Sequence, residues 1–254
     1  MVITKHEKFS KELETIVNDD IKKFAEAVLD DAPDYFFHVA ASSTGKYHPV
    51  YALGEGGLMR HTKAVVRMYN HLLSLDQYRN LFTEREIDLG RVACIAHDIQ
   101  KSGDEAKYIA QSNDGKNKVF TVFYHPLLAS QYILQYKNKY LSEEELKFIA
   151  SGVESHMGQW NTDKRSSVTL PTPETEMQKL IHLADYLASR KDLDVSFEDD
   201  NTAHELPSID EYTIGFGKHA GKKLTEIPKD YLRWLSGQDL REPLKSLVPL
   251  VLEN

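Results

Sequence analysis

His97 and Asp98 are adjacent residues near the end of an apolar run from Arg91 to Lys101, and both side chains can bind a metal ion. Neighbouring side chains on a helix point about 100° apart, so this pair needs partners from elsewhere in the chain to complete a site. Four further residues of suitable type lie at intervals of 27 to 36 residues along the chain: His61 before the pair, and His125, His156 and Asp185 after it. Each interval equals roughly one helix plus a loop, which predicts a site assembled between the helices of a bundle.

Four histidines and two aspartates match the requirements of a site with two metal ions. Imidazoles and carboxylates bind borderline divalent ions, and one carboxylate can bridge two of them. Asp98 is the natural bridge because it adjoins His97. An aspartate in an apolar helical setting without a cation would cost several kcal/mol or become protonated.

Apolar residues at helical spacing predict the elements that hold these side chains. Amphipathic helices are expected over 7–29, over 58–72 with His61 on the buried side, and over 84–101. Residues 54–57 read as a tight glycine turn before the His61 helix, and 102–124 as a long turn-rich connection. Further helices should begin at 125–126, at Ser142 with a capping box to Glu145 that leads to His156, and at 172–174 before Asp185. The expected fold class is mainly α.

The composition changes after about residue 190, where the chain becomes acidic and polar. This change predicts three parts: a helical domain over 1–195, a linker over 196–208 and a small C-terminal module over 209–254. Residues 212–223 favour a short β-hairpin, and a helix is expected from Pro228 through Leu235. The C-terminal module should therefore be a small α/β unit.

Charge and composition restrict the class of protein. A net charge of −8 in 254 residues argues against a protein that coats duplex DNA, although a local basic patch could hold a nucleic-acid end. Cys94 is the single cysteine, which fits a reducing compartment. We find no signal-peptide-like stretch and no uncharged run approaching 18 residues, so we expect a cytoplasmic protein with no membrane partner.

The order His61, His97-Asp98, His125, His156 and Asp185 resembles the HD-domain superfamily in its version with six ligands and two metals. The resemblance covers roughly residues 30 to 195 and implies an HD-domain helical bundle. It implies one metal held by His61, His97, Asp98 and Asp185, and a second held by Asp98, His125 and His156. A bridging water would be the nucleophile, and Asp98 with Lys101 would carry the catalysis. The metal could be Mn, Mg, Ni, Co or Fe.

Local motifs resemble more specifically the HD domain of bacterial 3′-to-5′ exoribonucleases and their phage relatives. These motifs are Gly56-Gly57-Leu58-Met59-Arg60-His61-Thr62, His97-Asp98-Ile99-Gln100-Lys101, Tyr124-His125-Pro126, Glu154-Ser155-His156-Met157-Gly158 and Leu183-Ala184-Asp185. The segments 214–224 and 227–235 resemble the C-terminal module of exodeoxyribonuclease X-like proteins. From Ile214 to Arg233 there are five basic and two acidic residues, which suggests a contact with single-stranded nucleic acid.

Other residues have a functional and a structural interpretation. Lys101 could neutralise phosphate or protonate a leaving oxygen, or it could be a solvated lysine at a helix end. His182 shares a helix face with Asp185 and could support the site or only pack. His182, His48, Arg190 and Lys218 are candidate substrate contacts. The alternatives are a structural role for His48, an exposed salt bridge for Arg190, and a place in a solvated turn for Lys218.

The pattern as a whole predicts a divalent-metal phosphohydrolase that cleaves phosphoester or phosphodiester bonds of nucleic-acid ends or nucleotides. A small-molecule nucleotidase or cyclic-nucleotide phosphodiesterase is the alternative within the hydrolases. A di-iron oxygenase with the same ligands and a nucleotide sensor without activity are alternatives of other classes. The expected partner is a nucleotide or single-stranded nucleic acid, and the sequence does not indicate an oligomeric state.

Overall fold

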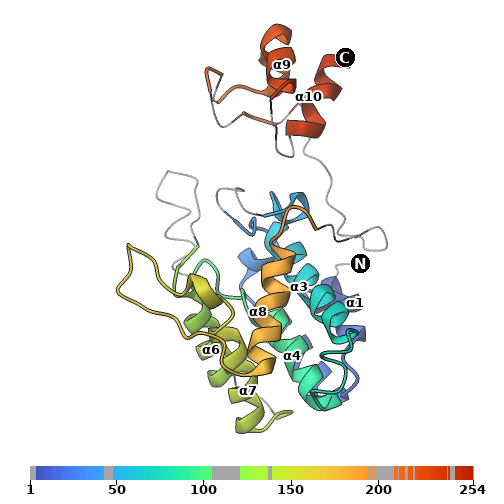
Figure 1. Ribbon diagram of the computed structural model, residues 1–254, viewed down its shortest axis with the longest axis vertical. Helices are drawn as coiled ribbons and strands as arrows, with labels where there is room; N and C mark the ends of the chain where they lie inside the picture. Colours follow the sequence, from blue (N-terminus) through green and yellow to red (C-terminus); the bar gives the residue numbers. More distant parts are fainter. Residues whose placement is uncertain are drawn as a thin grey trace. The chain divides into compact units, whose positions relative to one another are not determined.

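The chain divides into two compact units, Met1–Ser196 and Phe197–Asn254 (Figure 1). The computed structural model describes residues 4–42, 48–104, 121–136, 139–193, 195, 197, 209–210, 212–214, 217–219, 221–238, 240 and 244–253. Phe197 is the one described residue of the expected linker 196–208, so that linker stays a prediction.

The first unit is a bundle of helices, as the mainly α fold class predicts. Its α-helices are α1 (Ser10–Glu14), α2 (Asp19–Asp30), α3 (Gly57–Leu73), α4 (Glu84–Ala96), α6 (His125–Gln135), α7 (Glu143–Glu154) and α8 (Glu176–Ala188). Short 3-10 helices lie at His6–Phe9, Asp34–Phe37, Val50–Ala52 and Gly158–Trp160. Helix α3 packs on α8 and α4, and α7 packs on α6 and α4, so these five helices form the frame of the unit (Figure 1).

Glycine lets three of these helices approach closely. A Cβ atom at Gly90 of α4 would lie 2.1 Å from the Tyr69 hydroxyl on α3 and 2.8 Å from the Met177 sulfur on α8. A Cβ atom essentially never lies this close to a non-bonded atom, so a side chain at Gly90 would force the buried Tyr69 and Met177 side chains to shift. Buried apolar residues fill the rest of the interface, including Leu58, Val92, Ile95, Ile149 and Ile181.

The N-terminal helix predicted over 7–29 is interrupted between α1 and α2. The carboxylate of Asp88, which is fully buried in α4, accepts hydrogen bonds from the backbone N–H groups of Val17 and Asn18, at 3.0 and 2.8 Å. These N–H groups are thereby directed away from an α-helical ladder. The single predicted helix is therefore wrong, because a contact from 70 residues along the chain breaks it.

Helix starts follow the capping chemistry of the sequence more closely than helix ends do. Ser142 caps α7 in a box with Glu145, as predicted. Helix α8, expected to begin at 172–174, begins at Glu176 because the capping box is formed by Thr175 and Gln178. At the other end, α4 stops at Ala96 and not at Lys101, and α7 stops at Glu154, two residues before His156.

The residues after α4 form tight turns. Ile99 N–H donates to the Ala96 carbonyl, and Lys101 N–H donates to the Asp98 carbonyl, each three residues back. This spacing belongs to 3-10 geometry and not to the α-helix. His97 and Asp98 therefore lie in a turn that follows α4.

The second unit contains a 3-10 helix at Leu224–Glu226 and the α-helices α9 (Lys229–Ser236) and α10 (Leu244–Glu253). Its core includes Ile214, Leu224, Ile227, Leu232, Leu235, Leu247 and Val248. Helix α9 agrees with the expected helix, whereas α10 was not predicted. Of the expected hairpin, the described residues hold one antiparallel bridge, between Thr213 and Lys223, and no strand.

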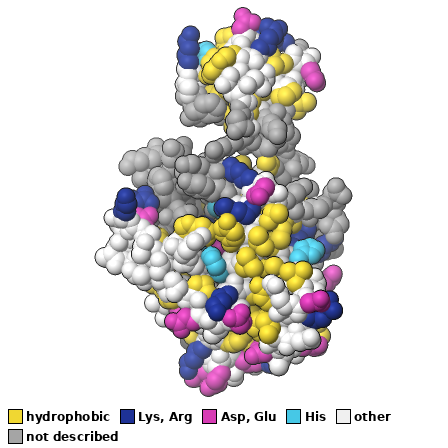
Figure 2. Space-filling view, viewed as in Figure 1, with side chains coloured by type: hydrophobic (Ala, Val, Ile, Leu, Met, Phe, Trp, Pro, Cys, Tyr) yellow, Lys and Arg dark blue, Asp and Glu magenta, His cyan; other side chains and the backbone are white. Residues whose placement is uncertain are grey.

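The surface of the first unit is mixed. Figure 2 shows that acidic and basic side chains gather together at one end of this unit, while hydrophobic side chains also reach the surface. The large hydrophobic residues with an exposed fraction above 40% include Leu75, Leu81, Leu134 and Trp160. None of the described helices has the length and apolar character needed to cross a membrane.

Candidate metal centre

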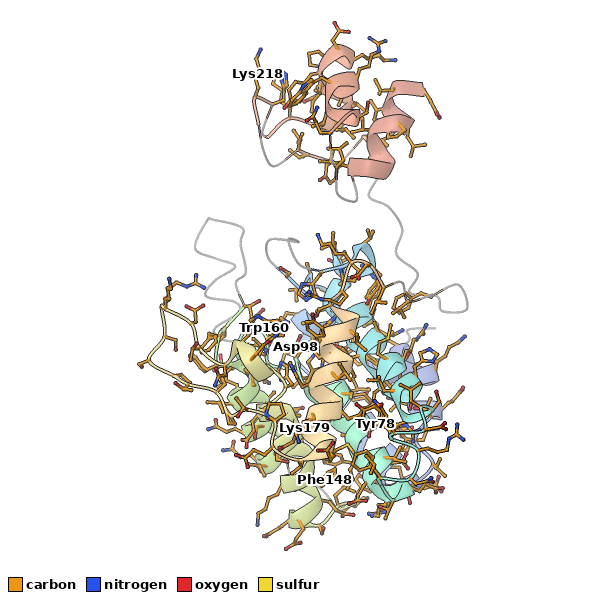
Figure 3. All side chains as sticks on the ribbon, viewed as in Figure 1. Tyr78, Asp98, Phe148, Trp160, Lys179 and Lys218 are labelled. Atoms are coloured by element: carbon orange, nitrogen blue, oxygen red, sulfur yellow. The ribbon has the colours of Figure 1, made fainter. Side chains whose placement is uncertain are left out.

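The bundle brings all six predicted ligands together in the interior of the first unit. His61 is in the first turns of α3, His125 begins α6 and Asp185 lies in α8, while His97 with Asp98 and His156 lie in the turns after α4 and α7. The four histidines and Asp98 are at most 1% exposed, and the Asp185 side chain is 17% exposed. Figure 3 labels Asp98 within the bundle.

Asp98 directs its two carboxylate oxygens at two different pairs of histidines. Its Oδ2 lies 3.3 Å from His97 Nε2 and 3.8 Å from His61 Nε2. Its Oδ1 lies 2.9 Å from His125 Nε2 and 3.7 Å from His156 Nε2. This carboxylate therefore stands between two clusters of imidazole nitrogens.

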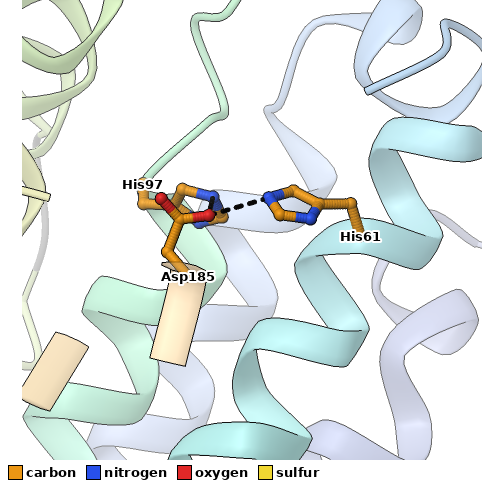
Figure 4. Close-up of side chains that lie close together, drawn as sticks. All are labelled: His61, His97 and Asp185. Atoms are coloured by element: carbon orange, nitrogen blue, oxygen red, sulfur yellow. Dashed lines mark ion pairs between the residues drawn. The ribbon is translucent and has the colours of Figure 1, made fainter. Parts of the chain in front are cut away.

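Asp185 completes the first cluster from the opposite helix. Its Oδ1 lies 3.0 Å from His61 Nε2 and 3.8 Å from His97 Nε2 (Figure 4). The ligand atoms of His61, His97 and Asp185 all lie within 4.8 Å of one another, and so do those of His97, Asp98 and His156. Each set is compact enough to hold a metal ion.

Backbone carbonyls fix the orientation of three of the imidazole rings. The Nδ1 atoms of His97, His125 and His156 each lie 2.7 Å from the carbonyl oxygen three residues earlier, on Cys94, Val122 and Val153. A carbonyl only accepts, so Nδ1 must carry the proton and donate it. Each Nε2 is left as a lone pair that faces the cluster, which is the usual arrangement of histidine ligands.

Several atoms in the cluster are buried without a hydrogen-bond partner in the described part of the chain. They are His97 Nε2, His125 Nε2 and Asp98 Oδ1. A buried polar atom that makes no hydrogen bond costs about 1–3 kcal/mol. These atoms are also close to one another and belong to ligand types suited to divalent ions, so the residues fit a metal centre.

Burial and mutual contacts set the ionisation of the cluster. Burial, with the nearby His97, lowers the pKa of His156 to about 3, and burial also lowers the pKa of His61. Burial opposes the charge on Asp98, but Lys101 and His97 outweigh it and hold the pKa of Asp98 well below its usual range. Neutral imidazoles and an ionised carboxylate are the forms that bind metal ions.

His97 and Asp185 also have shifted pKa values. Burial lowers the pKa of His97, but Asp98 outweighs it and the net pKa is raised. Burial likewise opposes the charge on Asp185, but the hydrogen bond to His61 helps hold the pKa of Asp185 below its usual range. A metal ion bound at Nε2 of His97 would replace the proton there.

Lys101 is held at the centre and is not a solvated lysine at a helix end. Its Nζ lies 2.5 Å from Asp98 Oδ2, and its side chain is 13% exposed. Lys101 thus places its positive charge directly against the Asp98 carboxylate. A phosphate bound at the centre would lie within reach of its positive charge.

His182 supports the backbone of a ligand. Its Nδ1 donates to the carbonyl oxygen of His156 at 2.7 Å. Gly158 has a φ of +55°, and a Cβ atom there would lie 2.3 Å from the His182 ring. Glycine is therefore needed for the turn after His156 to lie against His182. The substrate contact predicted for His182 stays a prediction.

The remaining candidates lie in different surroundings. The His48 ring lies 5.3 Å from the His61 ring, and burial lowers the pKa of His48 to about 3. The guanidinium of Arg190 lies 4.6 Å from the centre of the Tyr186 ring, with no ion pair among the described residues. Lys218 is exposed in a turn of the second unit (Figure 3). The substrate contacts of all three stay predictions.

An aromatic pair that was not predicted lies next to the chain segments that carry His156 and Asp185. Trp160 stacks on Tyr186, with ring centres 5.5 Å apart and an angle of 20° between the planes. Tyr186 directly follows Asp185, and Trp160 follows His156 by four residues. In the sequence, the spacing of Tyr186 and Arg190 by four residues was the available signal, but Arg190 lies beyond the end of α8 at Ala188, and nothing local relates Trp160 to either residue.

Comparison with known families identifies two regions. The HD domain model matches residues 59–190, which is just over half of the chain and includes all six predicted ligands. A second model, described as "Putative quorum-sensing-regulated virulence factor", matches residues 202–243. The search of curated proteins and the search of solved structures found no match. The long match over the helices that carry the ligands shows that this chain belongs to the HD-domain family, whose members are in general metal-dependent phosphohydrolases.

Proposed function

We propose that this protein is a divalent-metal phosphohydrolase that cleaves phosphoester or phosphodiester bonds of nucleotides or nucleic-acid ends. The observation that carries the proposal is the position of Asp98, whose two oxygens face separate pairs of histidines. Such a carboxylate suits a centre with two ions. One ion would be held by His61, His97, Asp98 and Asp185, and the other by Asp98, His125 and His156. The identity of the ions is left to experiment, with Mn, Mg, Ni, Co and Fe as candidates.

When bound, two divalent cations activate a water for attack and neutralise the charge that builds on phosphate. The chain's own residues orient the reaction. His97, His125 and His156 are held by backbone hydrogen bonds, so their Nε2 atoms do not have to reorganise when a ligand arrives. Lys101 holds a positive charge next to Asp98, where it would stabilise a phosphate or protonate the leaving oxygen.

The second unit supports a nucleic-acid substrate. Trp234 is 57% exposed, its ring centre lies 5.3 Å from that of Tyr231, and Tyr231 also contacts His219 at 4.6 Å. Lys222 and Lys223 are exposed in the same unit. Aromatic rings next to cations are typical of surfaces that bind single strands. Trp234→Ala should weaken binding of a short oligonucleotide, and unchanged binding would remove this role.

The test of the activity is a screen of short RNA, short DNA, deoxynucleoside triphosphates and cyclic nucleotides with each candidate metal. We expect metal-dependent phosphate or nucleotide release that Asp98→Ala abolishes. Asp76→Asn is the control, because the Asp76 side chain is 95% exposed and pairs only weakly with Arg79 at 3.4 Å. Hydrolysis that survives Asp98→Ala would reject this centre. Cyclic nucleotides as the sole substrates would favour the phosphodiesterase alternative, and bound iron with oxygen consumption would favour a di-iron oxygenase.

A further inference from the structure

We propose that Trp160, stacked on Tyr186, forms a platform that binds the base of a nucleotide whose phosphate lies at the metal centre. The inference rests on the proposed function, since it names the part of the substrate next to the reacting phosphate. It concerns a surface outside the metal ligands, and the platform is defined here as Trp160 and Tyr186.

The platform has an accessible aromatic surface. Trp160 is 44% exposed although it is one of the largest apolar side chains of the unit. The nearly parallel Tyr186 ring covers one face of the indole, at 5.5 Å between ring centres. The exposed part therefore lies on the remaining face and edge. A planar base would stack on this exposed part of the indole.

The platform is fixed to the metal centre through short covalent and hydrogen-bonded links. Tyr186 is the residue after Asp185 on α8, and Trp160 ends the 3-10 helix Gly158–Trp160 that follows His156. His182 donates to the His156 carbonyl, and its ring centre lies 6.1 Å from that of Trp160. Figure 3 labels Trp160 and Asp98 in the same region beside α8. A nucleotide whose base stacks on Trp160 would thus have its phosphate near the two clusters of histidines and aspartates.

The charge beside the platform favours a nucleotide over an apolar protein partner. The Arg190 guanidinium lies 4.6 Å from the centre of the Tyr186 ring, and its Nε is buried with no hydrogen-bond partner in the described part of the chain. An apolar partner would gain nothing from a cation without a carboxylate, whereas a phosphate would. The positive charge of Arg190 therefore adds to that of Lys101 in favouring an anionic ligand, such as a nucleotide, next to the platform.

The chain has two tryptophans, so Trp234→Phe leaves Trp160 as the single source of indole fluorescence. We would titrate this full-length variant in EDTA, which prevents hydrolysis, with adenosine 5′-monophosphate and with ribose 5-phosphate. The two probes differ only in the base. We expect saturable quenching by the nucleotide, after correction for its absorbance, and little by the sugar phosphate. Equal responses to both probes, or none to the nucleotide, would overturn the proposal.

Calorimetry on Trp160→Ala provides a second measurement. Stacking on one aromatic ring contributes enough that its loss should raise the Kd for adenosine 5′-monophosphate roughly 5- to 100-fold. Trp160→Phe keeps an aromatic ring and should therefore retain most of the affinity of the unmodified protein. This variant takes the place of Trp160→Ala in the measurement if the alanine variant does not fold. Leu81→Ala, at a side chain that is 52% exposed, is the control and should bind normally. Unchanged affinity in Trp160→Ala would reject the platform.

The two proposals fail in different ways. If nucleotides bind and quench Trp160 but no substrate is hydrolysed, the platform stands and the phosphohydrolase proposal falls. If nucleotides are hydrolysed with the same KM by Trp160→Ala and the unmodified protein, the phosphohydrolase proposal stands and the platform falls.

Discussion

Replacement of Asp98 by asparagine tests the metal centre most directly. The variant Asp98→Asn keeps the shape of the side chain but removes the negative charge that faces four histidines and Lys101. An amide also offers one good acceptor in place of two, so it cannot serve both clusters. We therefore expect Asp98→Asn to lose the stabilisation that a divalent ion gives to the folded chain.

The size of this stabilisation follows from mass action. An ion at 100 times its Kd stabilises the native state by about 2.7 kcal/mol. In a unit of this size, 1 kcal/mol moves the melting temperature by about 2–4 °C, so Mn²⁺ should raise it by roughly 5–11 °C. In Asp98→Asn the rise should shrink to about 2 °C or less. The comparison uses the rise and not the melting temperature itself, because the substitution also leaves Lys101 without its carboxylate.

The assay is thermal unfolding followed by Trp160 fluorescence in the Trp234→Phe background, which reports on the first unit alone. Asp88→Asn is the matched control. Asp88 is likewise buried and belongs to α4, but it binds the backbone N–H groups of Val17 and Asn18. The variant Asp88→Asn should lower the free energy of unfolding by an amount on the order of 2 kcal/mol and so lower the melting temperature of the ion-free protein. Mn²⁺ should still raise the melting temperature of this variant as it does in the unmodified protein.

The outcome that would refute the reasoning is a full rise with Mn²⁺ in Asp98→Asn. The ion would then bind without the carboxylate that stands between the clusters. Loss of the rise in Asp88→Asn as well would refute it in a different way, because general destabilisation alone would then account for the effect.

Three further substitutions test other parts of the site and fold. Gly158→Ala should cost at least about 1 kcal/mol from its positive φ, and it should lower kcat because the new Cβ collides with His182; unfolding and hydrolysis assays would measure both. Lys101→Met should lower kcat about 100-fold while the rise in melting temperature with Mn²⁺ persists, and an unchanged kcat would remove Lys101 from the reaction. Ser142→Ala should cost about 1 kcal/mol in chemical unfolding by removing the cap of α7, without a change in KM.

The predictable part of this protein is the part that local chemistry dictates. His61 falls on the buried side of α3 because apolar residues recur around it at helical spacing. The start of α7 follows from Ser142 and Glu145, which satisfy each other's backbone N–H groups. The six predicted metal ligands can be identified from their residue types and their order in the chain, without knowledge of the distances between them in the fold.

The features that the sequence analysis missed depend on distant residues. The gap between α1 and α2 exists because Asp88 accepts hydrogen bonds from residues 70 positions earlier. The stacking of Trp160 on Tyr186 joins residues from two separate elements. Neither contact leaves a trace in the local pattern of apolar residues. The early end of α4 was not predicted either, because the apolar run continues through Ile99.

His97 and Asp98 lie in the turn that begins where α4 stops at Ala96. As neighbours they point well apart, so the other residues of the two clusters come from α3, α6, α8 and the turn after α7. The Asp98 carboxylate faces both pairs of histidines. Among the last four carbonyls of α4 and α7, which lack partners within the helix, Cys94 and Val153 accept the Nδ1 protons of His97 and His156. The ends of α4 and α7 therefore supply both the turn that carries Asp98 and the carbonyl acceptors that orient the imidazoles of His97 and His156.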